Sequence, residues 1–150
     1  MRLAVALSVA VALLAAGAAP ALTPEAERTD GLPRYVDGYA KWPRLNRLPI
    51  RGGSAAHRGT KNVYSSKRRL GSRFPLGTIV VKTATPPGKK WLSLVATMRR
   101  LKATSNGGWR WEEFTRSSST ARFTKVAFPE SGSAACHAQA KATDYVFTRR

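Results

Sequence analysis

Two adjacent side chains near the C-terminus could bind a metal-containing group together. Cys136 is the only cysteine of the 150-residue chain, and His137, one of two histidines, follows it directly. In an exported protein, Cys-His closing a five-residue segment suggests covalent haem attachment, in which thiols form thioethers and the imidazole ligates the iron. In residues 133–137, Ser133 stands where the first of two cysteines is expected. The segment is therefore compatible with one thioether through Cys136, with non-covalent haem, with loss of haem, or with a purely structural Cys-His pair.

A lysine and two carboxylates are candidates for acid–base chemistry. Lys82 shares one face of a hydrophobic strand with Val80, and burial of a lysine there is costly unless the amine is used. The alternative is a strand end from which the ammonium reaches water. Glu112 and Glu113 could accept a proton from a substrate, although one of two adjacent strand residues must face away.

The N-terminus predicts export. Arg2 supplies a positive charge, residues 3–14 are almost entirely apolar, and small residues follow up to Ala21. This order is typical of a secretory signal peptide over residues 1–21, cleaved after Ala21 or Ala18. An uncleaved anchor is the alternative, but the apolar run is shorter than the roughly 20 residues that span a bilayer. We expect a periplasmic protein with no membrane span after cleavage.

The charge of the chain restricts its partners. Lys and Arg number 26 against 8 Asp and Glu, a formal net charge of +18, which indicates an anionic partner. Export argues against nucleic acid and favours an acidic protein or an anionic membrane surface. One cysteine excludes an intrachain disulfide framework and a four-cysteine zinc site, and two histidines exclude a three-histidine metal site.

Hydrophobic periodicity predicts the elements that position these side chains. A polar, Pro-flanked stretch over residues 22–33 is expected to be a flexible lead-in, followed by a helix to about residue 45 with Tyr35, Tyr39 and Trp42 on one face. That stripe is typical of core packing.

The remaining chain predicts an antiparallel sheet followed by a helix. Asn106-Gly107 indicates a hairpin. Residues 60–66, 78–83, 91–101 and 109–114 are the expected strands, and residues 134–142 the expected helix. The predicted class is α+β: about four antiparallel strands with flanking N- and C-terminal helices, in one domain over residues 34–150.

Several segments resemble the cytochrome P-460 family. Residues 133–137, followed by Thr-Asp-Tyr-Val-Phe-Thr at 143–148, resemble its C-terminal signature. Further segments match in order along the chain: 39–44 (its N-terminal helix with a Trp), 62–64 (x-Val-Tyr), 74–82 (Gly-Thr-x-x-Val-Lys) and 108–111 (Gly-x-Trp-x-aromatic). The resemblance implies a mainly β, periplasmic haem-binding fold of the cytochrome P-460 and cytochrome c'-beta type.

The resemblance also implies an activity and its residues. His137 would be the iron ligand, Cys136 the thioether residue, and Lys82 the lysine that the catalytic type bonds to the haem macrocycle. Such proteins oxidise hydroxylamine and pass electrons to an acceptor, here expected to be an acidic periplasmic electron-transfer protein. A related branch binds nitric oxide without turnover, so a non-catalytic haem domain is the alternative. A homodimer is compatible with either.

Three further residues complete the expected site. The resemblance implies a basic residue, expected as Arg, just before the x-Val-Tyr strand, and Lys61 occupies that position. His57 could face the distal side or be an exposed loop histidine. Asp144 could orient the imidazole of His137, as carboxylates often do for metal-bound histidines, or cap a turn.

Overall fold

The computed structural model describes residues 27–51, 57–101, 107–127 and 130–148. The predicted signal peptide, the start of the lead-in and Asn106 lie outside the described residues. No helix of the described residues is long and apolar enough to cross a membrane.

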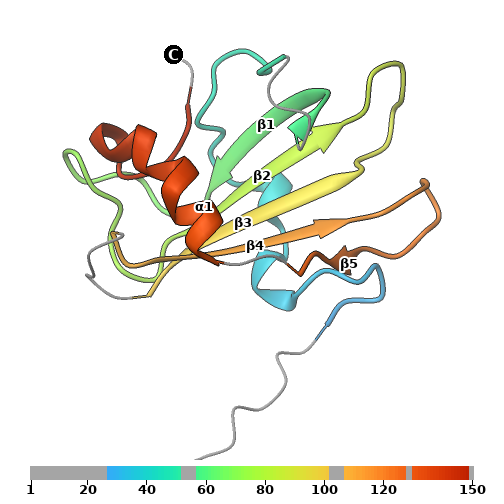
Figure 1. The fold of residues 1–150 in the computed structure, drawn as a ribbon, viewed down its shortest axis with the longest axis horizontal. Helices are drawn as coiled ribbons and strands as arrows, with labels where there is room; N and C mark the ends of the chain where they lie inside the picture. Colours follow the sequence, from blue (N-terminus) through green and yellow to red (C-terminus); the bar gives the residue numbers. More distant parts are fainter. Residues whose placement is uncertain (1–26, 52–56, 102–106, 128–129, 149–150) are drawn as a thin grey trace, which may run out of the picture.

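One antiparallel sheet organises the molecule (Figure 1). Its strands pair in sequence order, so each connects to its neighbour without a crossover. This confirms the predicted α+β class and adds a short fifth strand. The strands are β1 (Thr60–Ser65), β2 (Ile79–Thr85), β3 (Leu94–Arg100), β4 (Trp109–Thr115) and β5 (Thr124–Lys125).

Alternation along the strands gives the sheet two different faces. Lys82 pairs with Val63 on one side and with Ala96 on the other, and Ala96 pairs with Glu113. Directly paired residues share a face, so these side chains lie together on what we call the pocket face, with Val80, Met98 and Trp111. The opposite, closed face carries Val81, Val95, Thr97, Glu112 and Phe114.

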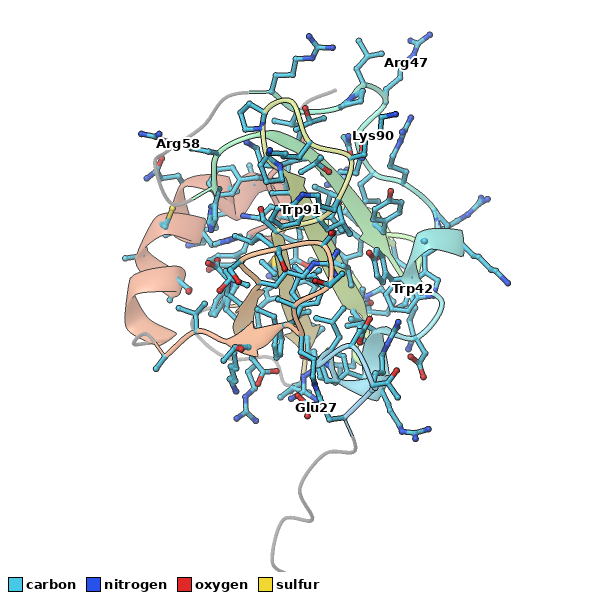
Figure 2. All side chains as sticks on the ribbon, turned by 90° about the vertical axis from the view of Figure 1, so that its right-hand side faces the viewer. Glu27, Trp42, Arg47, Arg58, Lys90 and Trp91 are labelled. Atoms are coloured by element: carbon cyan, nitrogen blue, oxygen red, sulfur yellow. The ribbon has the colours of Figure 1, made fainter. Side chains whose placement is uncertain are left out.

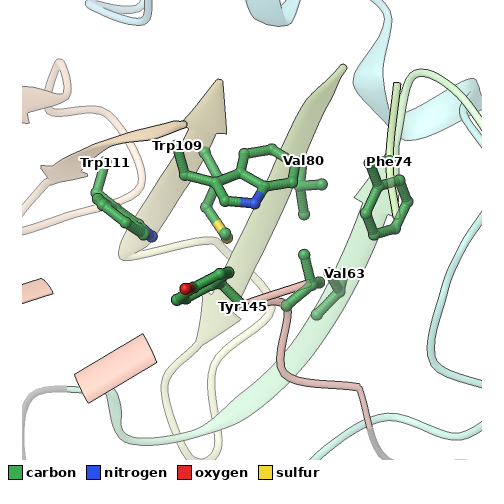
Figure 3. Close-up of a cluster of buried hydrophobic side chains, with 8 residues drawn as sticks. Val63, Phe74, Val80, Trp109, Trp111 and Tyr145 are labelled. Carbon is green, nitrogen blue, oxygen red and sulfur yellow. The ribbon is translucent and has the colours of Figure 1, made fainter. Parts of the chain in front are cut away.

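Each face packs against its own layer. On the pocket face, β-strand side chains form a cluster with Phe74, Trp109, Tyr145 and Val146 (Figure 3). On the closed face, Leu32, Val36 and Phe123 join the strand residues. Figure 2 shows the sheet between the C-terminal helix on one side and the N-terminal segment on the other.

The predicted N-terminal helix is wrong in form. Instead of one helix, there are two short 3₁₀ turns, η1 (Arg34–Val36) and η2 (Tyr39–Lys41). Between them Gly38 adopts a left-handed φ of 70°, which an α-helix does not accommodate. The aromatic side chains still serve the predicted purpose, because Tyr35, Tyr39 and Trp42 pack against the closed-face cluster.

The described part of the expected lead-in is packed into the fold. Leu32 is 2% exposed, and the Phe123 amide donates to the Asp30 carbonyl. Arg28 forms ion pairs with Asp30 and Asp37. One buried leucine in a polar stretch thus packs residues 27–33, part of the expected lead-in, against the closed face.

The C-terminal helix begins four residues earlier than predicted. It comprises α1 (Glu130–His137), which continues as the 3₁₀ helix η4 (Ala138–Thr143). Asp144 and Tyr145, with φ of 55° and 66°, end the helical segment. The change of helix type at His137 leaves this histidine at the end of α1.

Candidate haem site

A cavity of about 420 Å³ lies between the pocket face and α1. This volume falls within the roughly 300–1,000 Å³ of ligand-binding sites. Its wall is mostly apolar, with Val63, Val80, Met98 and Trp111 from the sheet. In ligand sites of this kind, the few polar groups of an apolar wall determine how a ligand is oriented.

His137 enters this cavity from the end of α1 in a defined orientation. Its Nδ1 lies 2.6 Å from the carbonyl oxygen of Tyr145, and a carbonyl only accepts, so Nδ1 carries the proton and Nε2 the lone pair. The rings of Trp111 and Phe147 lie 5.7 and 5.2 Å from the imidazole. Burial lowers the pKa of His137. A neutral imidazole with an oriented lone pair is the form that ligates a metal.

Cys136 and Ser133 also line the cavity. They are three residues apart on α1 and therefore lie on the same face of the helix. The free thiol of Cys136 is exposed. The helix thus brings the thiol, the serine and the imidazole of residues 133–137 to one cavity.

These residues fit a haem. The cavity offers an oriented imidazole, a thiol beside it and an apolar wall. In addition, the indole Nε1 of Trp111 is buried without a hydrogen-bond partner among the described residues, and native proteins rarely leave such a donor unpaired. A group with acceptor atoms in the cavity would satisfy it.

A second set of polar side chains lines the cavity from the sheet and the segment before β1. Lys82, the fourth residue of β2, lies with Nζ 3.1 Å from Nδ1 of His57. Nε2 of His57 lies 2.8 Å from Oε2 of Glu113. The three side chains form a continuous Lys82–His57–Glu113 chain. His57 is therefore not an isolated loop histidine.

Lys82 is perturbed by its position on the pocket face. Burial lowers the pKa of Lys82 to about 8, although the charge of Glu113 opposes that shift. Its place in the middle of β2 differs from the strand-end alternative. At pH 7 about a tenth of the amine is thus uncharged, far more than for an ordinary lysine, and this fraction has a nitrogen lone pair.

The carboxylates of the adjacent residues Glu112 and Glu113 have partners on opposite faces of the sheet. Glu113 borders the cavity, whereas the Glu112 carboxylate binds closed-face partners: the Tyr35 hydroxyl at 2.8 Å and the Lys125 ammonium. Burial alone would raise the pKa of Glu112, but hydrogen bonds from Lys125 and Tyr35 outweigh it and hold that pKa below its usual value. Glu112 also borders the cavity, but the strand period directs its carboxylate to the closed face, so the geometry favours Glu113 over Glu112 as the catalytic candidate.

Lys61 is not a cavity residue. It is 6% exposed, and its Nζ donates to the carbonyls of His57 at 2.7 Å and Gly59 at 3.1 Å. The geometry does not favour the predicted cofactor contact, since the ammonium is turned to the backbone before β1. Lys61 instead holds the segment that carries His57.

Asp144 does not contact His137. Its carboxylate accepts from Arg100 at 2.7 and 2.8 Å and from the Phe74 amide at 2.7 Å. The expected role of orienting the imidazole belongs to the Tyr145 carbonyl. The alternative prediction is closer, because Asp144 is the left-handed C-cap of η4.

Two contributors were missed from the sequence. No sequence pattern indicates that Arg100 pairs with Asp144, which lies 44 residues away. A backbone carbonyl such as that of Tyr145 carries no residue-type signal. The third partner of the acid–base chain, His57, had a signal: it is the only histidine besides His137.

Comparison with known proteins gives the same result as the geometry. The family model for Cytochrome P460 matches residues 37–148, a range that contains the whole sheet, α1 and the His137 segment. No curated protein matches the chain significantly. Because the match covers most of the 150 residues, the chain belongs to the cytochrome P460 family and is a haem-binding protein.

Proposed function

We propose that this chain is an exported, periplasmic haem protein that oxidises hydroxylamine or a similar small nitrogen compound. The observation that carries the proposal is the Lys82–His57–Glu113 chain, which shares one cavity with His137. A domain that only holds haem or binds nitric oxide has no use for a buried amine linked to an imidazole and a carboxylate.

The reaction requires proton acceptors beside the substrate. Oxidation of NH₂OH to HNO releases two protons and two electrons. Haem, when bound, supplies an iron that exchanges electrons with a small ligand. The protons must pass to protein groups within hydrogen-bond reach of the substrate. Glu113 and His57 are acceptors of this kind.

The exposure of these side chains defines a direction for the protons. The side chain of Glu113 is 14% exposed and that of His57 is 29% exposed. When the Lys82 amine is uncharged, its lone pair accepts from Nδ1–H of His57, which leaves the Nε2 lone pair directed at Glu113. A proton accepted by Glu113 can then pass over 2.8 Å to Nε2 of His57 and from there to solvent.

The proposal includes the mode of attachment. The thiol of Cys136 adds across one vinyl group, which forms a single thioether without loss of atoms. A bond from the Lys82 amine to the macrocycle replaces an N–H and a C–H and releases two protons and two electrons, which an oxidant such as hydrogen peroxide must take up. A haem-stained band on a denaturing gel that Cys136→Ala removes would refute attachment through Lys82 alone.

Electrons leave to an acidic partner. The net charge of +18 favours docking with an acidic periplasmic electron-transfer protein, and removal of the signal peptide with Arg2 reduces it by only one. Such docking accelerates association and weakens with added salt.

The test is hydroxylamine-dependent reduction of an artificial electron acceptor by haem-loaded protein. Lys82→Leu should abolish this activity, whereas Lys125→Leu, which removes a lysine on the other side of the sheet, should retain it. Full activity in Lys82→Leu would sink the proposal. Haem and nitric oxide binding without turnover in the wild type would favour the non-catalytic alternative.

A further inference from the structure

A buried ion pair joins the end of β3 to the turn after η4. Nη1 of Arg100 lies 2.7 and 2.8 Å from the two carboxylate oxygens of Asp144. The two side chains are 6% and 5% exposed. The Phe74 amide donates a third hydrogen bond, 2.7 Å long, to Oδ2 of Asp144. We call this arrangement the Arg100–Asp144 clamp.

The clamp lies at a turn of unusual backbone conformation. Asp144 and Tyr145 are consecutive non-glycine residues with φ of 55° and 66°. Aspartate tolerates the left-handed region, but tyrosine does so only where its surroundings enforce it. The Tyr145 ring is buried, and a Cβ on Gly107 would come within 2.6 Å of that ring. Packing on one side and the clamp on the other hold the turn.

The turn determines what His137 contacts. The Tyr145 amide donates to the Ala140 carbonyl, and its own carbonyl accepts the 2.6 Å hydrogen bond from Nδ1 of His137. The carbonyl is thus fixed to the sheet through the residue before it. Asp144, whose oxygens are occupied by Arg100 and Phe74, acts on the imidazole from one residue away.

We propose that Arg100 and Asp144 are positioning residues for the metal ligand. They hold the Tyr145 carbonyl against Nδ1 and thereby fix the tautomer, the orientation and the basicity of the His137 imidazole. The inference rests on iron ligation by His137, as in the proposed function, and is independent of the substrate. Hydrogen-bond partners of metal-bound histidines commonly have this effect.

A contribution to stability does not by itself explain the buried ion pair. Burying two charges costs desolvation energy that their attraction only partly offsets, and apolar replacements of similar volume often stabilise a protein. A pair that is retained in the core, beside a strained turn and one residue from the contact to His137, is better explained by the geometry that it enforces.

The test is Asp144→Asn in the full chain, since asparagine also tolerates the left-handed conformation. In haem-free protein, nitrogen NMR of His137 should show the Nδ1-protonated tautomer in the wild type and a mixture of both tautomers in the variant. Haem affinity should fall by about 10- to 100-fold. The reduction potential of the haem-loaded variant should rise, because a less basic imidazole stabilises ferric iron less.

Two other variants separate positioning from general stability. Arg100→Met should repeat the tautomer change, because it releases the same turn. Val95→Ala removes buried volume on the closed face and should leave the tautomer and the reduction potential of the wild type. An unchanged tautomer in both clamp variants, or an equal change in Val95→Ala, would overturn the inference. Failure of the wild type to bind haem would refute the proposed function, while the NMR result on haem-free protein would still decide the role of the clamp.

Discussion

The two faces of the sheet differ in how completely their side chains are partnered. On the closed face, Glu112 binds Tyr35, Lys125 and Arg99, and the N-terminal turns cover the apolar residues. On the pocket face, one residue further along β4, the Glu113 carboxylate contacts His57 in a short chain that ends at Lys82. The strand period alone separates these two carboxylates.

The energetically unfavourable features of this small fold lie on the pocket face. The pocket face keeps a lysine with a lowered pKa, an indole Nε1 of Trp111 without a described partner and a cavity of about 420 Å³. Each feature is unfavourable in a protein core. Their concentration on one face indicates a binding site, whereas the closed face supplies stability.

The largest expected effect concerns the two carboxylates. Glu113→Gln should lower the turnover of hydroxylamine by about 10²- to 10⁴-fold, the range for loss of a general base. Glu112→Gln should leave turnover close to that of the wild type. Steady-state kinetics on both haem-loaded variants measure this, and equal losses would break the distinction between the faces.

Truncation of valines should reveal the stability of each face. Val95 is fully buried on the closed face, and Val95→Ala should cost about 2–3 kcal/mol of unfolding free energy from lost burial and the new cavity. Val63→Ala on the pocket face only enlarges an existing cavity, so we expect about 1 kcal/mol. Urea denaturation of both haem-free variants compares them; a larger loss for Val63→Ala would reverse the assignment.

Lys82 should make haem-free protein less stable around neutral pH. Its pKa is about 8 in the folded state against 10.5 for a free lysine, so between these values the unfolded state binds more protons and stability rises with pH. Lys82→Met should stabilise by about 3 kcal/mol at pH 7, because the pKa of Lys82 differs by about 2.5 units between the two states and each unit corresponds to about 1.36 kcal/mol. That advantage should disappear above pH 10.5. A constant advantage across this range would contradict the buried, perturbed amine.

Glu112 should contribute a smaller effect at acid pH. Because its folded pKa is lowered, its stabilisation is present above the unfolded pKa of about 4.3 and is lost as pH falls through the folded pKa. Glu112→Gln should cost about 1 kcal/mol at pH 7, as expected for a hydrogen bond to a charged group, and progressively less in acid. Parallel stability curves of wild type and variant would show that the network does not depend on this charge.

The sequence predicted the sheet better than the segments around it. Long β-branched strands such as β2 and the Gly107 hairpin are local signals, so their positions could be read directly. The prediction of one N-terminal helix was wrong at Gly38, because the left-handed conformation of this residue interrupts the helix that the aromatic stripe indicated. The thiol and the imidazole of the site could be predicted because Cys136 and His137 are adjacent in the chain. The contacts around His137 could not be predicted. The hydrogen bond that orients the imidazole involves the backbone carbonyl of Tyr145, which carries no residue-type signal.

The most direct test is the optical spectrum of wild-type protein isolated from a periplasmic host. Haem bound on the pocket face with Lys82 attached to the macrocycle predicts a ferrous Soret band shifted strongly to the red, and Lys82→Leu should return it to an ordinary position. An ordinary band in the wild type would contradict the Lys82 attachment, and the absence of any Soret band would contradict the haem site itself.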